Sequence, residues 1–364
     1  MFTLMVALVA YRNVFPKQTN NRLLAYYRAL DEEEQTPRFY FIKGKSDLPR
    51  FRIKSFQTFL VNIPYIGILL GILSAWFFFL INRKDKIIYL YDPNAFWWPL
   101  TRLWRMQGRK LIVERTELHS RDIVEGFKAR FLRQLYEIDE RTKYQHQVVI
   151  SERIQEKLLM SVNSEITVIP AFFESHHFHG AFTQPQGIKV GYLGSFGKKD
   201  MVEGIIQAVE FLRDDYPNAT LHLYGPLDAL RFDQENALPA WVSYEGSPVY
   251  TQLADHLRSC SVLVSFRDRS IYSEFGFPTK LIEYLASGVP VISTNSAEVD
   301  KIVRHEEHLL LCDAEDVHAL ASNLKTCAND EESAYEMAVR GRDRVTETCE
   351  FDRFRSTWLD LVLK

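Results

Sequence analysis

A lysine and a glutamate lie close together at the expected start of a short helix, at Lys280 and Glu283. Pro278 and Thr279 predict this start, because proline blocks an earlier helical turn and threonine can cap the first turn. Free backbone amides at a helix N-terminus favour an anion such as pyrophosphate. A carboxylate one turn further on can accept hydrogen bonds from two vicinal hydroxyls of a ribose. The pairing therefore predicts a nucleotide site.

The residues around this pair define the element that must position it. Leu281, Ile282 and Leu285 form the buried stripe of a two-turn helix. Gly288 suits the left-handed position after the last turn. The apolar run that follows, Val289 to Ser293, predicts a buried strand.

The length of 364 residues predicts two domains, since single domains usually hold about 100 to 150 residues. Residues 1–180 hold 26 Lys and Arg against 18 Asp and Glu, a net charge of +8, whereas residues 181–364 carry −11. A basic first half predicts an anionic partner, which is a membrane surface, a phosphorylated substrate or a nucleic acid. A nucleic acid is the weakest of these, because the arginines alternate with buried strands and no recognised motif accompanies them.

The four cysteines lie in the second half and form no CxxC pair. This pattern predicts neither a zinc site nor a disulfide framework, and the expected location is the cytoplasm. The apolar start of the chain, Phe2 to Tyr11, lacks a basic n-region and a small-residue cleavage site, so we read it as a strand rather than a signal peptide.

Strands alternate with helices along both halves, which predicts two doubly wound parallel sheets. We expect a linker at residues 174–187, a first domain at 1–182 and a second at 183–350. An amphipathic helix at 351–364 is expected to pack back on the first domain. The expected strands are 3–11, 38–42, 87–92, 111–119, 147–151 and 166–170, then 188–193, 220–224, 241–245, 261–266 and 308–311; the expected helices are 23–30, one starting near 151, 201–214, 250–259 and 298–304.

Residues 63–81 form an uncharged apolar run that is long enough to span a membrane. A strand follows it at once, and Pro64, Gly67 and Gly71 lower its helix propensity. We favour a core helix, with an interfacial membrane contact next and a true span last. A basic rim beside an apolar aromatic segment is what a monotopic membrane surface requires.

Two other groups of residues have candidate chemistry. Trp97, Trp98 and Trp104 lie among arginines on an expected helix, which we read as a solvated face with a few core tryptophans. Three histidines of the linker, His176, His177 and His179, fit no standard metal-ligand spacing, so we predict no metal.

The second half resembles the GT-B glycosyltransferases, specifically glycosyltransferase family 4. The resemblance is carried by GYLGSFGKK, LHLYGP, YEGSPVYTQLADHLRSCSVLVSF and FPTKLIEYLASGVPVIST between Ile188 and Thr294, and by ITVIPAFFE at 166–174. The first 160 residues match only in the order of their elements. The resemblance implies an α/β GT-B fold, with two Rossmann-like domains facing each other across a cleft.

The family pattern assigns roles to residues of the second half. It implies that Glu283 binds the donor ribose and that the helix-start amides of Thr279, Lys280 and Leu281 take the diphosphate. Gly194 and Ser195 would approach the same phosphates, with Lys198 or Lys199 adding positive charge. The family's basic pair, which stabilises the leaving diphosphate, has no clear counterpart here, and Arg267 is a substitute candidate.

The family also has a glutamate eight positions before the ribose one, near the transferred sugar. Position 275 is Phe275 here, and Glu274 lies one residue earlier. Either the loop is shifted by one residue and Glu274 is the donor-binding glutamate, or Glu274 has another task. In the first half, Glu117 and His119 follow an expected strand, where parallel sheets bind their ligands. The resemblance places an active-site histidine there, and we favour Glu117 for orienting the acceptor.

The resemblance implies a retaining transfer that needs no metal or other cofactor. The donor would be a nucleotide-diphosphate sugar, and the acceptor a glycan or a lipid-linked glycan of surface polysaccharide synthesis. The expected location is cytoplasmic, with contact to the inner face of the cell membrane through 63–81 and the basic half. The alternatives are a nucleotide-sugar epimerase or hydrolase, and a degenerate membrane-associated partner subunit.

Overall fold

The computed structural model forms two compact units, Met1–Pro170 with Phe354–Lys364, and Ala171–Arg353. The sequence-based boundary lies slightly later in the chain, after residue 182. The structure describes residues 5–12, 21–43, 53–55, 73, 76–81, 84–92, 97–116, 144–159, 165–180, 182, 185–226, 238–248 and 252–364.

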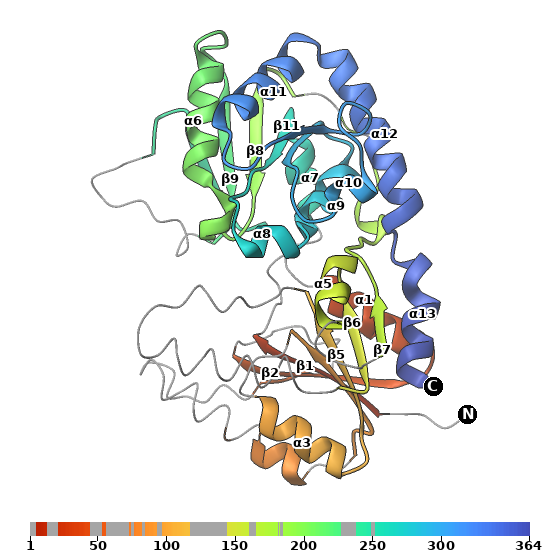
Figure 1. Cartoon of the computed structure of the whole chain (residues 1–364). Helices are drawn as coiled ribbons and strands as arrows, with labels where there is room; N and C mark the ends of the chain where they lie inside the picture. Colours follow the sequence, from red (N-terminus) through yellow and green to blue (C-terminus); the bar gives the residue numbers. More distant parts are fainter. Residues whose placement is uncertain are drawn as a thin grey trace. The chain divides into compact units, whose positions relative to one another are not determined.

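The first unit is built on a parallel sheet of seven strands in the order β3-β2-β1-β4-β5-β6-β7 (Figure 1). Such a sheet is covered on both faces, so its strands are apolar runs, as in β4, where the first four residues are buried. The strands are β1 (Met5–Arg12), β2 (Thr36–Lys43), β3 (Ile53–Ser55), β4 (Ile87–Tyr91), β5 (Lys110–Arg115), β6 (His146–Val149) and β7 (Glu165–Val168), and the helices include α1 (Asn21–Glu32), α3 (Trp98–Met106), α5 (Glu152–Leu159) and α13 (Asp352–Leu363).

Helix α3 covers the face of the sheet to which Ile88 and Leu90 belong. Trp97 and Trp104 are buried in this cluster, whereas Arg102 and Arg105 are exposed. The expected solvated face with core tryptophans is therefore confirmed for these residues.

Helix α13 covers the opposite face of the same sheet, although it comes from the end of the chain. The Trp358 ring stacks on Tyr26 of α1 at 4.1 Å between centroids and meets Tyr89 of β4 edge-on at 5.6 Å. The Lys110 ammonium also donates to the Leu361 carbonyl oxygen at 2.6 Å. These contacts make α13 an integral part of the first unit.

The second unit contains a parallel sheet of six strands in the order β10-β9-β8-β11-β12-β13. Helices α6 and α11 lie on one face, and α7, α9 and α12 lie on the other (Figure 1). The strands are β8 (Lys189–Leu193), β9 (Thr220–Tyr224), β10 (Val242–Gly246), β11 (Val262–Ser265), β12 (Val291–Thr294) and β13 (Leu310–Cys312), and the helices are α6 (Val202–Arg213), α7 (Leu253–Arg258), α8 (Ile271–Phe275), α9 (Thr279–Ser287), α10 (Val299–Ile302), α11 (Val317–Asn329) and α12 (Glu331–Cys349).

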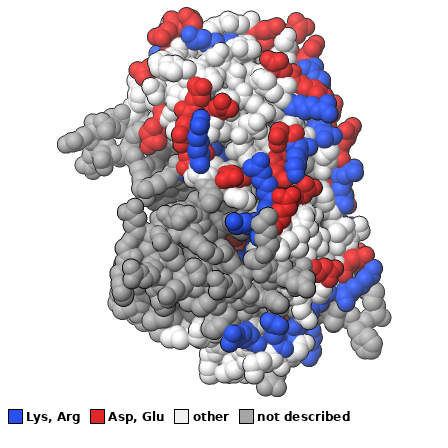
Figure 2. Space-filling view, in the orientation of Figure 1, with Lys and Arg blue, Asp and Glu red and all other residues white. Residues whose placement is uncertain are grey.

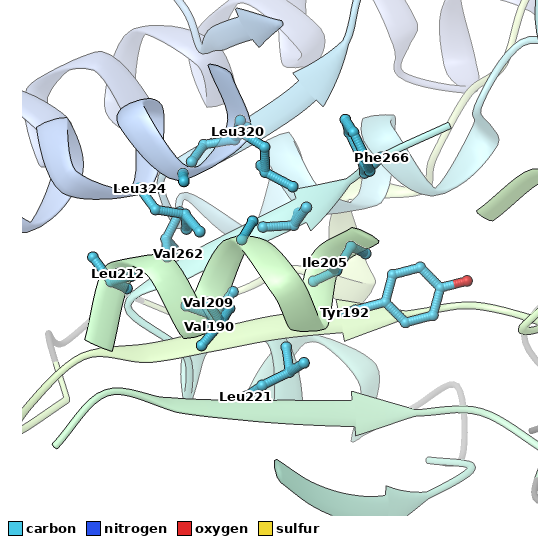
Figure 3. Close-up of a cluster of buried hydrophobic side chains, with 14 of the residues drawn as sticks. Val190, Tyr192, Ile205, Val209, Leu212, Leu221, Val262, Phe266, Leu320 and Leu324 are labelled. Carbon is cyan, nitrogen blue, oxygen red and sulfur yellow. The ribbon is translucent and has the colours of Figure 1, made fainter. Parts of the chain in front are cut away.

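The core of the second unit lies between the sheet and the helix pair α6 and α11 (Figure 3). Val190 and Val262 of neighbouring strands pack there with Leu212 and Leu320 of the two helices. Tyr192 lies at the border of this cluster with its hydroxyl directed away from it (Figure 3). The four cysteines are buried and free.

Several elements differ from the sequence-based expectations. Strand β3 and helices α11 and α12 were not predicted. Pro278, not Thr279, is the N-cap residue of α9, and no side chain caps this helix, so the predicted threonine cap is wrong. Gly288 does take the left-handed conformation after α9, with φ 75°.

The apolar run 63–81 is described only at residue 73 and at 76–81, and residues 76–81 are helical. Phe79 is buried against Trp104, as expected of a core helix, but Phe77, Leu80 and Ile81 are exposed. Within the described part of the chain, no helix is long and apolar enough to cross a membrane.

Candidate functional site

The candidate site lies at the carboxyl ends of β8 and β11, which are neighbours at the centre of the second sheet. From β8 the chain continues to β9 on one side, whereas from β11 it continues to β12 on the other. Such a topological switch point is where open parallel sheets bind ligands. Residues 194–200 follow β8, and residues 266–278 lead from β11 to α9.

Tyr284 fastens α9 to the end of β8. Its hydroxyl accepts a hydrogen bond from the Leu193 amide at 2.7 Å and donates to the Leu193 carbonyl oxygen at 2.9 Å. Burial raises the pKa of the Tyr284 phenol, so the group stays protonated and can donate. The start of α9 is thereby held beside the loop that follows β8.

The position after β8 has room only for glycine. A Cβ atom on Gly194 would lie 2.1 Å from the Tyr192 hydroxyl and 2.8 Å from Lys280 Nζ. The Gly194 amide donates to the Tyr224 carbonyl oxygen at 3.0 Å, which continues the strand pairing. The first residues of the loop therefore contact the lysine at the start of α9.

Lys280 forms a buried ion pair that the sequence did not reveal. Its ammonium lies 2.6 Å from Asp200 Oδ1, donates to the Tyr192 hydroxyl at 3.3 Å, and stands over the Tyr192 ring. Burial disfavours ionisation of Asp200, but the positive charge of Lys280, with help from Arg267 and Lys199, holds its pKa at about 2. Asp200 is therefore a carboxylate at neutral pH.

Two further cations contribute to the same electrostatic environment. The Arg267 guanidinium is buried and donates to the Gly276 carbonyl oxygen at 2.6 Å, and the Arg267 amide donates to Thr294 Oγ1 at 2.9 Å. The amide of Asp268 donates to the Lys199 carbonyl oxygen at 3.2 Å, which joins the two loops. Burial, together with the charges of Arg267 and Lys199, lowers the pKa of Lys280 against the opposing effect of Asp200. The charges of Lys280, Arg267 and Lys199 thus all favour the ionised form of Asp200.

Glu283 lies one turn into α9 and is buried, with 9% of its surface exposed. Thr279 is exposed at the start of the helix. The Leu281 amide donates to the Pro278 carbonyl oxygen at 2.8 Å, so one of the three amides predicted for a diphosphate already has a partner. The amides of Thr279 and Lys280 precede it.

The remaining predicted residues of the second unit lie on the same two loops. Ser195 is exposed and its hydroxyl lies 3.4 Å from Asp200 Oδ2. Lys198 starts a short 3-10 helix, Lys198–Asp200. Glu274 is exposed on α8, and Phe275, which ends this helix, is half-buried.

Two predicted residues, Glu117 and His119, lie outside the described residues. The strand before them, β5, is described and ends at Arg115. They remain predictions.

Sequence reasoning missed three residues of this site, Asp200, Tyr192 and Tyr284. Asp200 follows a pair of lysines in the loop after β8, and no local pattern links it to Lys280. A signal did exist for Tyr284, because it lies three residues after Leu281 and therefore on the same buried side of α9.

Residues 187–330 match the family described as glycosyl transferases group 1. The match runs from the start of β8 to the end of α11 and includes every residue of the site described above. No sequence among the curated proteins matches the chain.

Solved structures resemble the whole chain. Sucrose-phosphate synthase from Thermosynechococcus elongatus is 17% identical with a TM-score of 0.77, over 98% of both chains. HepE of Anabaena, solved with UDP-glucose, is 12% identical with a TM-score of 0.71 over 98% of both chains. The pneumococcal O-GlcNAc transferase GtfA, solved with UDP and GlcNAc, is 10% identical with a TM-score of 0.71, over 99% of this chain and 98% of the other.

The two parallel sheets and these likenesses define the class of the protein, which has the GT-B fold of glycosyltransferases. Within the second unit, the similarity to the glycosyl transferases group 1 covers residues 187–330. The expected fold class is confirmed.

Proposed function

We propose that this protein is a retaining glycosyltransferase that moves a sugar from a nucleotide-diphosphate sugar to a hydroxyl of a glycan or lipid-linked glycan. The proposal is carried by one observation: at the switch point of the second sheet, Lys280 at the start of α9 pairs with Asp200 of the loop after β8, with Glu283 buried one turn further on. The likeness to HepE and GtfA supports it, because those proteins were solved with UDP-glucose and with UDP and GlcNAc.

Each residue of the site has a role in this proposal. Glu283 accepts hydrogen bonds from the ribose hydroxyls, and the amides of Thr279 and Lys280 receive the diphosphate. Arg267 and Lys199 stabilise the negative charge that develops on the leaving diphosphate. Lys280 joins them once the diphosphate competes with Asp200 for its ammonium.

The proposed reaction proceeds with retention at the sugar. The acceptor hydroxyl attacks on the face from which the nucleotide leaves, and an oxygen of the donor phosphate takes its proton. The protein orients the two substrates and stabilises the leaving group, so the transfer needs no metal. Proton NMR of the first product tests retention, and activity measured in EDTA tests the independence from metal.

A thermal-shift screen of uridine, guanosine and adenosine diphosphate sugars tests donor binding. A ligand at 100 times its Kd stabilises the folded state by about 2.7 kcal/mol, so the true donor class should stand out. Replacing Glu283 by Ala removes a charged hydrogen-bond acceptor, worth about 1.5–3 kcal/mol, and should weaken donor binding about 10- to 100-fold.

Glu203→Ala is the matched control, because Glu203 is an exposed glutamate on α6 of the same unit. It should bind the donor like the unmodified protein. If Glu283→Ala binds and turns over the donor as well as this control does, Glu283 is not the ribose ligand and the assignment of the site is wrong.

We further propose that the first unit contacts the inner face of the cell membrane, where a lipid-linked acceptor would lie. Phe77, Leu80 and Ile81 are 66%, 51% and 63% exposed on the helical segment that packs on α3. Arg102 and Arg105 of α3 are exposed, and Figure 2 shows basic side chains gathered at this end of the unit. Apolar side chains beside basic ones suit an interface with anionic lipids.

Sedimentation with anionic lipid vesicles tests this contact. The variant Phe77→Ser/Ile81→Ser should lose most of its vesicle binding. Leu159→Ser is the control, since Leu159 is a comparably exposed leucine, at 53%, on α5 of the same unit. Equal binding by both variants would rule out this surface as the contact.

A further inference from the structure

The segment that opens the second unit brings together three metal-ligating side chains. Glu174, His176 and His177 offer one carboxylate oxygen and two ring nitrogens, and these three atoms all lie within 4.8 Å of one another. Glu174 Oε2 lies 3.8 Å from His177 Nε2, and the two imidazole rings are 3.9 Å apart between centroids. The described part of the chain contains no second cluster of this kind.

A short 3-10 helix, Ser175–His177, produces this arrangement. With about three residues per turn, a 3-10 helix places side chains three positions apart on the same side, which brings His177 next to Glu174. The His176 ring lies against the His177 ring. The sequence spacing fitted no standard metal motif because those motifs assume regular helices or fingers. The turn, and not the sequence spacing, therefore brings the three side chains together.

The surrounding structure holds the turn in place. The amide of Phe173 donates to the Cys349 carbonyl oxygen at 3.1 Å, and the amide of Phe351 donates to the Phe173 carbonyl oxygen at 3.0 Å. Ser175 donates from both its amide and its hydroxyl to Glu350. The backbone before and within the 3-10 helix is thus fixed to the end of α12, which limits how far the three side chains can separate.

The burial of the three side chains suits a partly enclosed site. Glu174 is 7% exposed, His177 is half-buried and His176 is exposed. In a tetrahedral zinc site, with bonds of about 2.0–2.2 Å, the ligand atoms lie about 3.4 Å apart. The distance of 3.8 Å between Glu174 Oε2 and His177 Nε2 is close to this value. The exposed His176 ring can rotate to bring one of its nitrogens to a similar distance from both atoms.

We propose that Glu174, His176 and His177 bind one divalent transition-metal ion, with water completing the coordination. Imidazole nitrogen with a carboxylate favours zinc, cobalt, nickel or copper over magnesium and calcium. The proposed site lies within one short segment of the second unit and uses none of the residues assigned to sugar transfer. Its success or failure is therefore independent of the proposed function.

Isothermal titration of the tag-free, EDTA-dialysed full chain with Zn²⁺ tests the proposal. One ion should bind per chain, and binding should weaken as the pH falls from 7.5 to 5.5, because imidazole must be neutral to bind a metal. His176→Ala and His177→Ala should each lower the affinity at least about tenfold. His176 is exposed, so its replacement should leave the fold intact.

His179→Ala is the matched control, because His179 is an exposed histidine of the same segment outside the cluster. It should bind zinc like the unmodified chain. The proposal is overturned if no single-equivalent binding is seen, as expected if Glu174 and a protonated His177 form only an ion pair. It is equally overturned if all three histidine variants bind zinc alike.

Discussion

Replacing Lys280 or replacing Asp200 breaks the same ion pair, but the two changes should affect nucleoside diphosphate binding differently. Lys280→Met removes one of three cations from the proposed diphosphate site. Asp200→Asn removes the carboxylate that competes with the diphosphate and leaves the three cations. Both variants break the same 2.6 Å contact, so they separate a structural role of the pair from a role in ligand binding.

The lowered pKa of Asp200 gives the size of the change in unfolding free energy that we expect for Asp200→Asn. A fall from 3.8 to about 2, at about 1.4 kcal/mol for each pKa unit, corresponds to about 2 kcal/mol. Because the folded-state pKa is depressed, this contribution is fully present above pH 3.8 and is lost as the pH falls toward 2. Asp200→Asn should therefore lower the free energy of unfolding by about 2 kcal/mol at pH 7, and the difference should shrink below pH 4.

The assay combines urea denaturation with titration of the nucleoside diphosphate that the donor screen identifies. Both variants should be less stable than the unmodified protein, because each leaves a buried charge without its partner. Lys280→Met should bind the diphosphate at least about tenfold more weakly, a loss of about 1.4 kcal/mol. Asp200→Asn should bind it as tightly as the unmodified protein or more tightly.

Lys325→Met serves as the control, because Lys325 forms a surface ion pair with Asp215 at 2.6 Å on the same unit. It should change neither stability nor affinity measurably. The reasoning is refuted if Asp200→Asn and Lys280→Met weaken diphosphate binding to the same extent. The ion pair would then only hold the loop after β8 against the start of α9.

Three further predictions follow from individual contacts. Gly194→Ala places a methyl group against the phenol and ammonium groups around it, so donor binding should fall sharply, and calorimetry should show this loss. Tyr284→Phe removes both hydrogen bonds to Leu193 and leaves buried backbone groups without this partner, which should cost about 1–3 kcal/mol in urea denaturation and should also weaken donor binding. Trp358→Ala leaves a cavity beside Tyr26 and should lower the stability of the first unit by about 3–5 kcal/mol, with unchanged donor affinity in the second.

The parallel strands were the most predictable elements, since burial on both faces makes them continuous apolar runs. The five residues of β4 illustrate this, because four in succession are buried. Strand β3 was not predicted because it is only three residues long and two of them are a lysine and a serine. A run of that length has no periodicity to detect.

Helices α11 and α12 carried signals that were overlooked. Asp316 accepts a hydrogen bond from the Ala319 amide, and Asp330 accepts one from the Ser333 amide, so each helix begins with an aspartate cap. In α11, Leu320, Leu324 and Cys327 recur on one buried face. The cap signals and this spacing would have been enough to predict both helices.

The place in the chain of the helix that carries Glu283 followed from the sequence, because Pro278, the buried stripe and Gly288 are local features. The partner of Lys280 did not follow, because Asp200 lies 80 residues earlier. A pattern of residue types shows which groups can carry charge, but only the fold shows which of them meet. The same limit applies to the turn at Glu174, where the backbone conformation, and not the spacing, brings the three side chains together.

The origin of α13 at the end of the chain has a consequence for synthesis of the protein. Trp358 fills a place between α1 and β4, so the first 170 residues cannot complete their own core when they leave the ribosome. Domains usually fold in the order in which they are made. Here the second unit, which is continuous in sequence, can complete its folding first. The first unit, although its strands are made earlier, can complete its core only when residues 354–364 emerge from the ribosome. A nascent chain stalled before residue 354 should therefore keep its first unit sensitive to protease, while the second is already protected.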